Sequence, residues 1–243
     1  MTTGRLNALR QLAFVVPALL ALTLPLTGLA GSDAETTEDG LQLVEENRHR
    51  SLYVAPDVDW SRYSAIQLED PTVEFRRNWQ RDQNRSWPFK VRDEDVVEIK
   101  QSLAELLIEV FGEELSRDGG YALSDESGSQ VLILRPAITE LDVAAPDTQN
   151  WAGISYQYTE SSGRMTLQLE LIDSVSGKVL SRFKERDEVP RMYYYQRTNR
   201  VTNEADARRM LRRWAEEQRE RLDEARSESM AMHAADKSAA SAD

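Results

Sequence analysis

The stretch DEDVVEIKQSLAELLIEVFGEELSRDGG, residues 93–120, decides the fold. Its apolar stripe consists of Val96, Ile99, Leu103, Leu106, Leu107, Val110 and Phe111. This recurrence every three or four residues is the spacing of one face of an α-helix. Asp93 can cap the start of the helix, and Gly119 and Gly120 can end it, since glycine readily adopts the left-handed conformation that closes helices. The stretch therefore predicts an amphipathic helix over residues 93–118 with one buried face.

A second decisive pattern lies at residues 164–185. Every second residue from Met165 to Leu171 is apolar, which is the period of a half-buried β-strand. The segment DSVSG, residues 173–177, separates this run from a second alternating run at 179–185. Two such runs around a turn that contains glycine predict a β-hairpin.

Further segments complete the list of expected elements. The strand candidates are 52–54, 63–69, 72–75, 121–123 and 130–143. Pro71 and Pro136 interrupt two of them, and because proline lacks an N–H we expect a bend or a sheet edge at each. A last helix is expected over 203–225, with Asn203 as its N-cap and charged residues at ion-pair spacing around one apolar face.

This order of elements predicts an α+β fold. We expect a two-layer sandwich, in which a mostly antiparallel sheet of about 4–5 strands carries two amphipathic helices packed on one face. A single domain over residues 51–226 accommodates all of these elements and is of ordinary size.

Both ends of the chain lie outside this domain. Residues 1–30 combine two arginines, an apolar run and then small residues, which is the order of a cleaved signal peptide. The apolar run is shorter than a permanent membrane span needs. We therefore expect export to the periplasm or cell envelope, with cleavage between Ala30 and Ala34. Residues 31–50 are expected to form a linker, and 227–243 a disordered tail.

The cleavage region holds a second signal. Leu29-Ala30-Gly31-Ser32 is similar to the box that precedes the lipidated cysteine of bacterial lipoproteins, with Ser32 in the place of the cysteine. A serine hydroxyl is a much weaker nucleophile than a thiolate, so we do not expect membrane attachment through a lipid. Either the leader is an ordinary signal cut after Ala30, or the chain is a relative of lipoproteins that has lost its anchor.

Composition narrows the classes of function. The chain has no cysteine, which excludes disulfides, cysteine nucleophiles and thiolate metal sites. Its formal net charge is −12, and removal of the two arginines of the leader makes it −14. So acidic a protein is poorly suited to nucleic acid, which we do not expect as a partner, or to an anionic membrane surface.

Three motifs together resemble a known family. They are YVAPDVDWSRY at residues 53–63, GGY at 119–121 after the long helix, and DSVSG at 173–177 in the hairpin. In this combination the chain resembles a family of proteobacterial envelope proteins, domain of unknown function DUF3313, over roughly residues 39–222. The resemblance implies an envelope location, and many members look like lipoproteins. It supplies no established activity and no catalytic residue.

The sequence provides no catalytic, cofactor-binding or metal-binding residue that we can assign. Its two histidines are His49, between arginines, and His233, in the expected tail. There is no Gly-x-Ser-x-Gly elbow, and no glycine-rich phosphate loop follows a strand. Asp57 and Asp59 could act as paired carboxylates in glycan hydrolysis. Alternatively, residues 57–60 form a turn from which Trp60 packs into the core.

Residues 76–92 are the candidate contact surface. We expect a loop here, rich in arginine with tryptophans between. Arginine forks can hold carboxylate or phosphate, and tryptophan offers a stacking face. The candidate partner-binding residues are Arg76, Arg77, Trp79, Arg81, Arg85 and Trp87. Alternatively, the arginines pair with the protein's own acids and the tryptophans pack on the sheet. The tyrosines at 193–195 could extend this surface or form a linker strand.

Three hypotheses of function follow. The first is a non-enzymatic accessory or binding module of the envelope, with an envelope protein or a cell-wall component as its partner. The second is a carboxylate-dependent hydrolase of envelope glycan or peptide. The third is a structural subunit that self-assembles through exposed sheet edges.

Overall fold

The structure is a computed structural model, and it describes residues 36–86, 90–143, 157–159, 163–188, 196–198 and 200–240. By its internal contacts the chain divides into two units, residues 1–33 and 34–243, and all of the described residues belong to the second. The expected leader and its cleavage site therefore lie outside the described residues. No helix in the described ranges combines the length and the apolarity needed to cross a bilayer.

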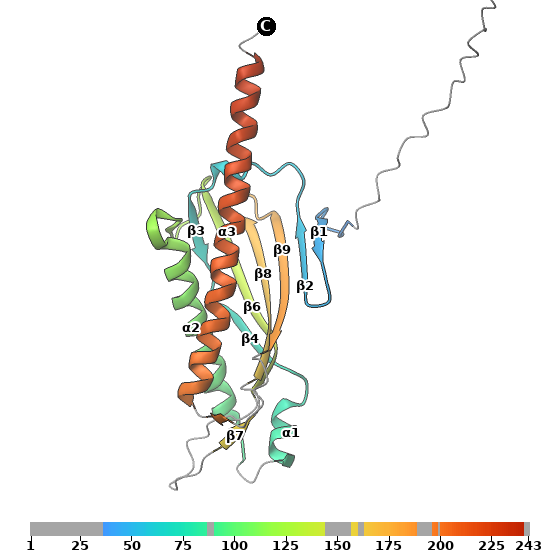
Figure 1. Cartoon of the computed structure of the whole chain (residues 1–243), viewed down its shortest axis with the longest axis vertical. Helices are drawn as coiled ribbons and strands as arrows, with labels where there is room; N and C mark the ends of the chain where they lie inside the picture. Colours follow the sequence, from blue (N-terminus) through green and yellow to red (C-terminus); the bar gives the residue numbers. More distant parts are fainter. Residues whose placement is uncertain are drawn as a thin grey trace, which may run out of the picture. The chain divides into compact units, whose positions relative to one another are not determined.

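The fold is α+β, built on a mixed sheet of eight strands (Figure 1). Seven strands follow the order β1-β2-β9-β8-β6-β3-β5, and β4 pairs with β6. The pairings β1–β2, β2–β9, β9–β8 and β8–β6 are antiparallel, whereas β3 and β4 run parallel to β6, and β5 parallel to β3. The strands are β1 Gln42–Glu46, β2 Arg50–Val54, β3 Ala65–Leu68, β4 Thr72–Phe75, β5 Ala122–Leu123, β6 Val131–Val143, β8 Gly163–Asp173 and β9 Val179–Glu188.

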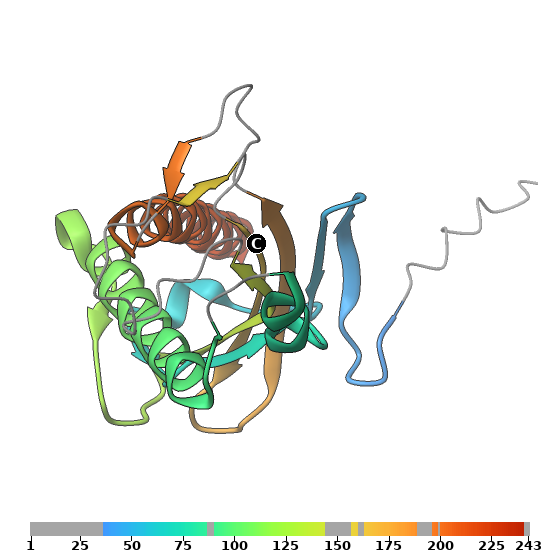
Figure 2. The same ribbon diagram turned by 90° about the horizontal axis from the view of Figure 1, so that it is seen from below.

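The helices and the remaining short elements complete the fold. Helices α2 (Asp93–Ser116) and α3 (Arg200–Ala240) lie on the same face of the sheet (Figure 2). A third, short helix, α1, spans Trp79–Ser86. Two 3₁₀ turns, η1 (Trp60–Arg62) and η2 (Arg117–Gly119), and a small separate sheet of β7 (Gln157–Thr159) and β10 (Gln196–Thr198) are the other elements. The expected hairpin is confirmed as β8 and β9.

The expectation of about 4–5 strands and two helices was too low. One reason is that β3 and β4 are separate strands, divided at Pro71, and both pair with β6. Leu68 lies opposite Leu134, and Thr72 lies opposite Ala137. Between these two pairs, the chain beside β6 passes from β3 to β4 and makes no regular pairing. The N–H that Pro136 lacks is therefore not needed for a hydrogen bond to β3 or β4. This explains how a proline fits in the middle of β6, which is a central strand.

The linker and tail boundaries also need correction. Strand β1 lies within residues 31–50, which we expected to be a linker, because pairing with β2 satisfies its backbone and Leu41 beside it is fully buried. Helix α3 continues to Ala240 through the expected disordered tail. The composition of residues 227–243 indicated only that they could not form a hydrophobic core. The alanines of this segment are nonetheless strong helix formers, so it extends an existing helix, whose residues from Met230 to Ala240 are exposed.

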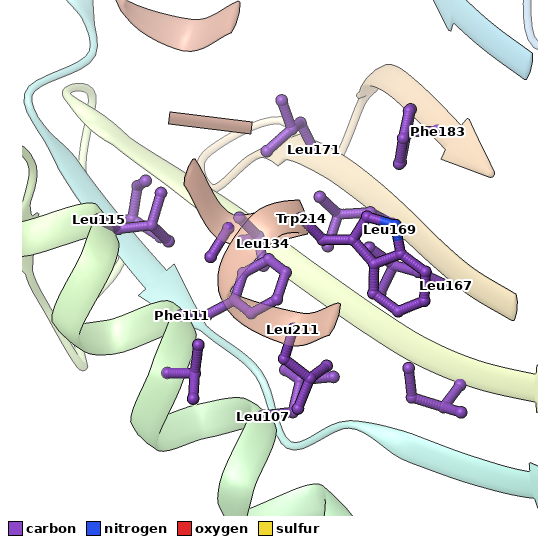
Figure 3. Close-up of a cluster of buried hydrophobic side chains, with 14 of the residues drawn as sticks. Leu107, Phe111, Leu115, Leu134, Leu167, Leu169, Leu171, Phe183, Leu211 and Trp214 are labelled. Carbon is purple, nitrogen blue, oxygen red and sulfur yellow. The ribbon is translucent and has the colours of Figure 1, made fainter. Parts of the chain in front are cut away.

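The core fills the space between the helices and the sheet. In Figure 3, Phe111 of α2 and Trp214 of α3 point into the space over the strands that carry Leu134, Leu167 and Leu169. All five side chains are at most 2% exposed. Loss of so large a buried ring leaves a cavity, and Trp214→Ala would cost about 3–5 kcal/mol.

Helix ends differ in detail from expectation. Arg92, and not Asp93, is the N-cap of α2, and its N–H donates to the carboxylate of Asp95. Helix α3 begins at Arg200, so Asn203 lies inside it. Helix α2 ends at Ser116, two residues before the expected Asp118, and the left-handed conformation expected at the glycines is found at Gly119 and also at Asp118.

The C-terminal end of α2 is held by a side chain from α3. The guanidinium of Arg219 donates to the carbonyl oxygens of Glu114, Leu115 and Arg117 at 3.0–3.1 Å. These are carbonyl groups that an isolated helix end leaves without partners. A Cβ on Gly120 would collide with this guanidinium and with the Leu115 carbonyl, so only glycine fits at this position.

Ion pairs tie α3 to the far edge of the sheet. Arg50 of β2 lies 3.5 Å from Glu45, 2.7 Å from Glu185 and 2.5 Å from Glu217. Arg213 of α3 also contacts Glu185, at 3.0 Å. Burial alone would lower the pKa of Arg50, but the surrounding carboxylates, Glu185 foremost, outweigh it and raise this pKa.

Candidate functional site

The candidate contact segment contains a helix where we expected a loop. α1 is held against the sheet by Trp79, which is 1% exposed and stacks on Phe75 with ring centroids 4.0 Å apart. The indole Nε1 of Trp79 and the side-chain amide of Gln83 both donate to the carbonyl oxygen of Val143, at 3.1 and 3.2 Å. One face of α1 is thereby anchored. Trp79 is buried and so is not available to stack on a ligand.

Arg76 belongs to this anchor and not to an open surface. Its guanidinium pairs with Asp82 at 2.8 Å and with Asp142 at 2.9 Å. The hydrogen bond with Asp82 raises the pKa of Arg76, and the same bond lowers the pKa of Asp82. For Arg76 and Trp79, the alternative interpretation from the sequence, internal pairing and packing, is therefore correct.

The other three arginines of the candidate surface are exposed. Arg81 and Arg85 are four residues apart on α1, which places them on one helical face, and Arg77 lies two residues before the helix begins. Arg81 has its side chain 62% exposed, with Asp82 at 3.4 Å. We call these three residues the arginine face. The sixth candidate, Trp87, lies outside the described residues, as do the tyrosines at 193–195.

A shallow pocket adjoins the arginine face. Its volume is about 440 Å³, and it lies between α1, β4 and α2. Arg76, Arg81 and Lys100 bring positive charge to its lining, and Glu74 brings negative charge. Lys100 comes from α2, and no sequence pattern indicated that it lies near the arginines.

Two of the three motifs that resemble the family meet at a buried carboxylate. Asp173, in the hairpin turn, accepts from the hydroxyl of Tyr63 at 2.8 Å, from Arg62 at 2.5 Å, and from Ser176 N–H and Oγ at 2.7 Å each. Burial by itself raises the pKa of Asp173, but these hydrogen bonds outweigh it and bring this pKa to about 2. Burial, followed by the bond to Asp173, raises the pKa of Tyr63. Every partner here is internal, so the cluster is an anchor between η1 and the hairpin.

Residues 57–60 form a turn, which was the alternative to a catalytic pair of Asp57 and Asp59. Asp57 is left-handed, with φ 58°, and Asp59 caps η1 by accepting from the N–H and Oγ of Ser61. Trp60 packs against the core, as the turn interpretation expected.

His233 lies beside this turn, because α3 extends further than expected. Its Nδ1 is 3.5 Å from Ser61 Oγ, and its Nε2 is 3.8 Å from Asp59. In a catalytic triad the histidine stands between the serine and the acid, whereas here the serine hydroxyl donates directly to Asp59 at 2.5 Å. This arrangement does not activate the serine. The other histidine, His49, is exposed.

A groove that the sequence did not indicate lies between the two long helices. It has a volume of about 360 Å³ and is bordered by α2 from Asp95 to Glu109, by the first part of α3, by the end of β6 and by the start of β8. Its apolar lining includes Ile99, Val143 and Ala207, one from each of α2, β6 and α3. We call it the α2/α3 groove. Within the described ranges, no three His, Asp or Glu side chains gather as they would around a metal ion.

Comparison with known proteins places the chain in a family. No curated protein matches it at a significant level. Among solved structures, the PelC dodecamer from Paraburkholderia phytofirmans is similar at 9% identity, over 69% of this chain and 94% of that one, with a TM-score of 0.35. A DUF330 protein from Xanthomonas campestris is similar at 12% identity, over 73% of this chain and 95% of that one, with a TM-score of 0.38. Likeness at this level supports no inference about function. The family model described as "Protein of unknown function (DUF3313)" matches residues 34–218, and the chain belongs to this family.

Proposed function

We propose that this protein is a non-enzymatic accessory or binding module of the cell envelope, in which the arginine face contacts an anionic envelope protein or cell-wall component. The observation that carries the proposal is the division of α1 into two faces. Trp79 and Gln83 fix one face to the fold, while Arg81 and Arg85 lie on the exposed face and Arg77 is exposed just before the helix.

The chemistry of the arginine face fits an anionic partner. Guanidinium groups bind carboxylate and phosphate through paired, charge-assisted hydrogen bonds. The protein as a whole is strongly acidic, so this local concentration of positive charge would guide an anionic partner to one place. The rigid attachment of α1 reduces the loss of backbone freedom on binding.

The leader supports an envelope location. Residues 1–30 would direct export, and with Ser32 in place of a cysteine the mature chain would be free in the periplasm. N-terminal sequencing of the protein from a periplasmic extract should find a start between residues 31 and 34. An intact Met1 in that extract would contradict this part of the proposal.

Affinity capture with matched variants tests the binding role. The mature chain would be immobilised beside a variant with Arg77→Gln, Arg81→Gln and Arg85→Gln, and exposed to solubilised envelope. A second variant with Lys178→Gln, Lys184→Gln and Arg186→Gln removes the same charge from exposed positions elsewhere. We expect the first variant alone to lose its captured component. Equal capture by all three proteins would exclude the arginine face as the contact.

A further inference from the structure

The α2/α3 groove is a separate surface with chemistry opposite to that of the arginine face. Val96 and Lys100 of α2 line the pocket beside the arginine face, while Asp95 and Ile99 line the groove. The two hollows therefore lie on different sides of the first half of α2.

The floor of the groove is apolar and incompletely covered. Ile99, Val143 and Ala207 pack against the core but are only half-buried. Beneath them, Leu106 and Met165 are almost fully buried. Covering apolar surface that water still reaches with another apolar group is favourable.

The rim of the groove is acidic. Five carboxylates and one guanidinium line it among the described residues. The guanidinium, Arg208, is already bound to Glu109 through two contacts of 2.7 and 3.3 Å, and it lies 3.7 Å from Glu204. Its pKa is raised by Glu109, and the pKa of Glu109 is lowered in turn. The rim therefore keeps a negative excess after this internal pairing.

Helix stability explains only part of this acidity. Asp95 lies in the first turn of α2, where negative charge offsets the helix dipole, whereas Glu204 lies beyond the first turn of α3. Glu105 and Glu109 lie in the middle of α2, beyond the reach of that effect, which fades after the first turn. Glu105 is exposed and accepts a single hydrogen bond, at 3.2 Å, from Gln101.

We propose that the α2/α3 groove binds an amphipathic segment of a partner protein, with its apolar side chains on the floor and its Lys or Arg side chains along the rim. The occupant follows from charge complementarity around an apolar floor. An anionic or wholly polar segment would meet either repulsion or an uncovered apolar surface. An apolar helix stripe flanked by basic residues satisfies both features of the groove.

Two synthetic peptides provide the probes. One is an 18-residue amphipathic helix of Leu and Lys, and the other has the same pattern with Glu in place of Lys. Fluorescence anisotropy with the mature chain should show saturable binding of the Leu/Lys peptide and none of the Leu/Glu peptide. Equal binding of both peptides, or binding of neither, would overturn the proposal.

Matched variants separate the groove from net charge. Glu105→Gln should weaken binding by about threefold, the size of a partly screened ion pair, whereas Glu126→Gln, at an exposed loop position, should leave it unchanged. Ala207→Trp fills the groove and should weaken binding by about tenfold or more, as expected when a well-formed apolar contact is lost. Circular dichroism checks that this variant folds, and the surface variant Glu105→Gln remains informative if it does not.

Peptide binding by the α2/α3 groove does not depend on whether the arginine face binds a partner. The variant with Arg77, Arg81 and Arg85 changed to Gln should bind the Leu/Lys peptide as tightly as the parent chain. Equal weakening by Glu105→Gln and Glu126→Gln would mean that the peptide senses only the overall charge, and would overturn the groove as its site.

Discussion

The hydroxyl of Tyr63 donates a buried hydrogen bond of 2.8 Å to the carboxylate of Asp173, across 110 positions of sequence. The bond joins the turn at residues 57–63 to the turn of the β8–β9 hairpin. Two of the three motifs that suggested the family thus stabilise each other. These contacts give the residues of both motifs an architectural role.

Removal of this hydroxyl should destabilise the fold. Tyr63→Phe leaves the charged Asp173 with one donor fewer in a buried place, and we expect a loss of about 1.5–3 kcal/mol in the free energy of unfolding. Urea titration followed by circular dichroism measures it. Tyr53→Phe, at a half-buried position on β2, is the control and should change stability little. If Tyr63→Phe and Tyr53→Phe lowered the free energy of unfolding equally, the Tyr63–Asp173 hydrogen bond would not be the cause of the loss.

Asp173 should also make stability depend on acid pH. Its pKa is about 2 in the folded protein, against about 3.9 for an unfolded aspartate, so the folded state favours the ionised form. This stabilisation is complete above about pH 5 and is lost as the pH falls through 4 towards 2, by about 2.6 kcal/mol in total. Asp173→Asn should flatten that part of the stability profile. Parallel profiles of the parent chain and the variant between pH 5 and 2 would contradict the assignment.

Gly120 should tolerate no side chain. In Gly120→Ala the new methyl group collides with the Leu115 carbonyl and with the Arg219 guanidinium that caps α2. We expect destabilisation of more than about 2 kcal/mol, as in other overpacked sites. Gly128→Ala is a matched control, because its nearest neighbour would be an ordinary contact at 3.4 Å. Thermal melts of both variants provide the comparison.

Arg50 should matter more than an exposed arginine. Arg50→Met leaves Glu185, whose side chain is 9% exposed, with Arg213 as its remaining ion-pair partner among the described residues, and should cost about 2–3 kcal/mol. Arg135→Met, which breaks the more exposed pair with Glu69, should cost less than about 1 kcal/mol. Adding Glu185→Gln to Arg50→Met should recover part of the loss. No recovery would mean that an unpaired buried charge is not the cause.

Local patterns predicted the elements whose structure depends on local spacing. The stripe from Val96 to Phe111 and the alternation from Met165 to Leu171 each repeat several times within one element, and α2 and β8 match them closely. Helix α1 escaped prediction because its stability depends on Trp79 reaching Phe75 and Val143, which no local pattern records. Strand β1 escaped for a similar reason, since its backbone partners come from β2.

The candidate site was predicted only in part. The sequence indicated the segment that contains the arginine face, but the separation of Arg76 from Arg77, Arg81 and Arg85 depends on Asp142, 66 positions away. The α2/α3 groove needs Ile99, Val143 and Ala207 to meet, and each of them alone reads as an ordinary core residue. Both features arise from tertiary contacts.

The most direct measurement of the binding role is site-specific crosslinking in the periplasm. A photoreactive phenylalanine analogue would replace Arg81, with replacement of Glu126 as the control. We expect light to produce an adduct with an envelope component from position 81 and none from position 126. The same adducts from both positions, or no adduct from position 81, would contradict a contact made by the arginine face.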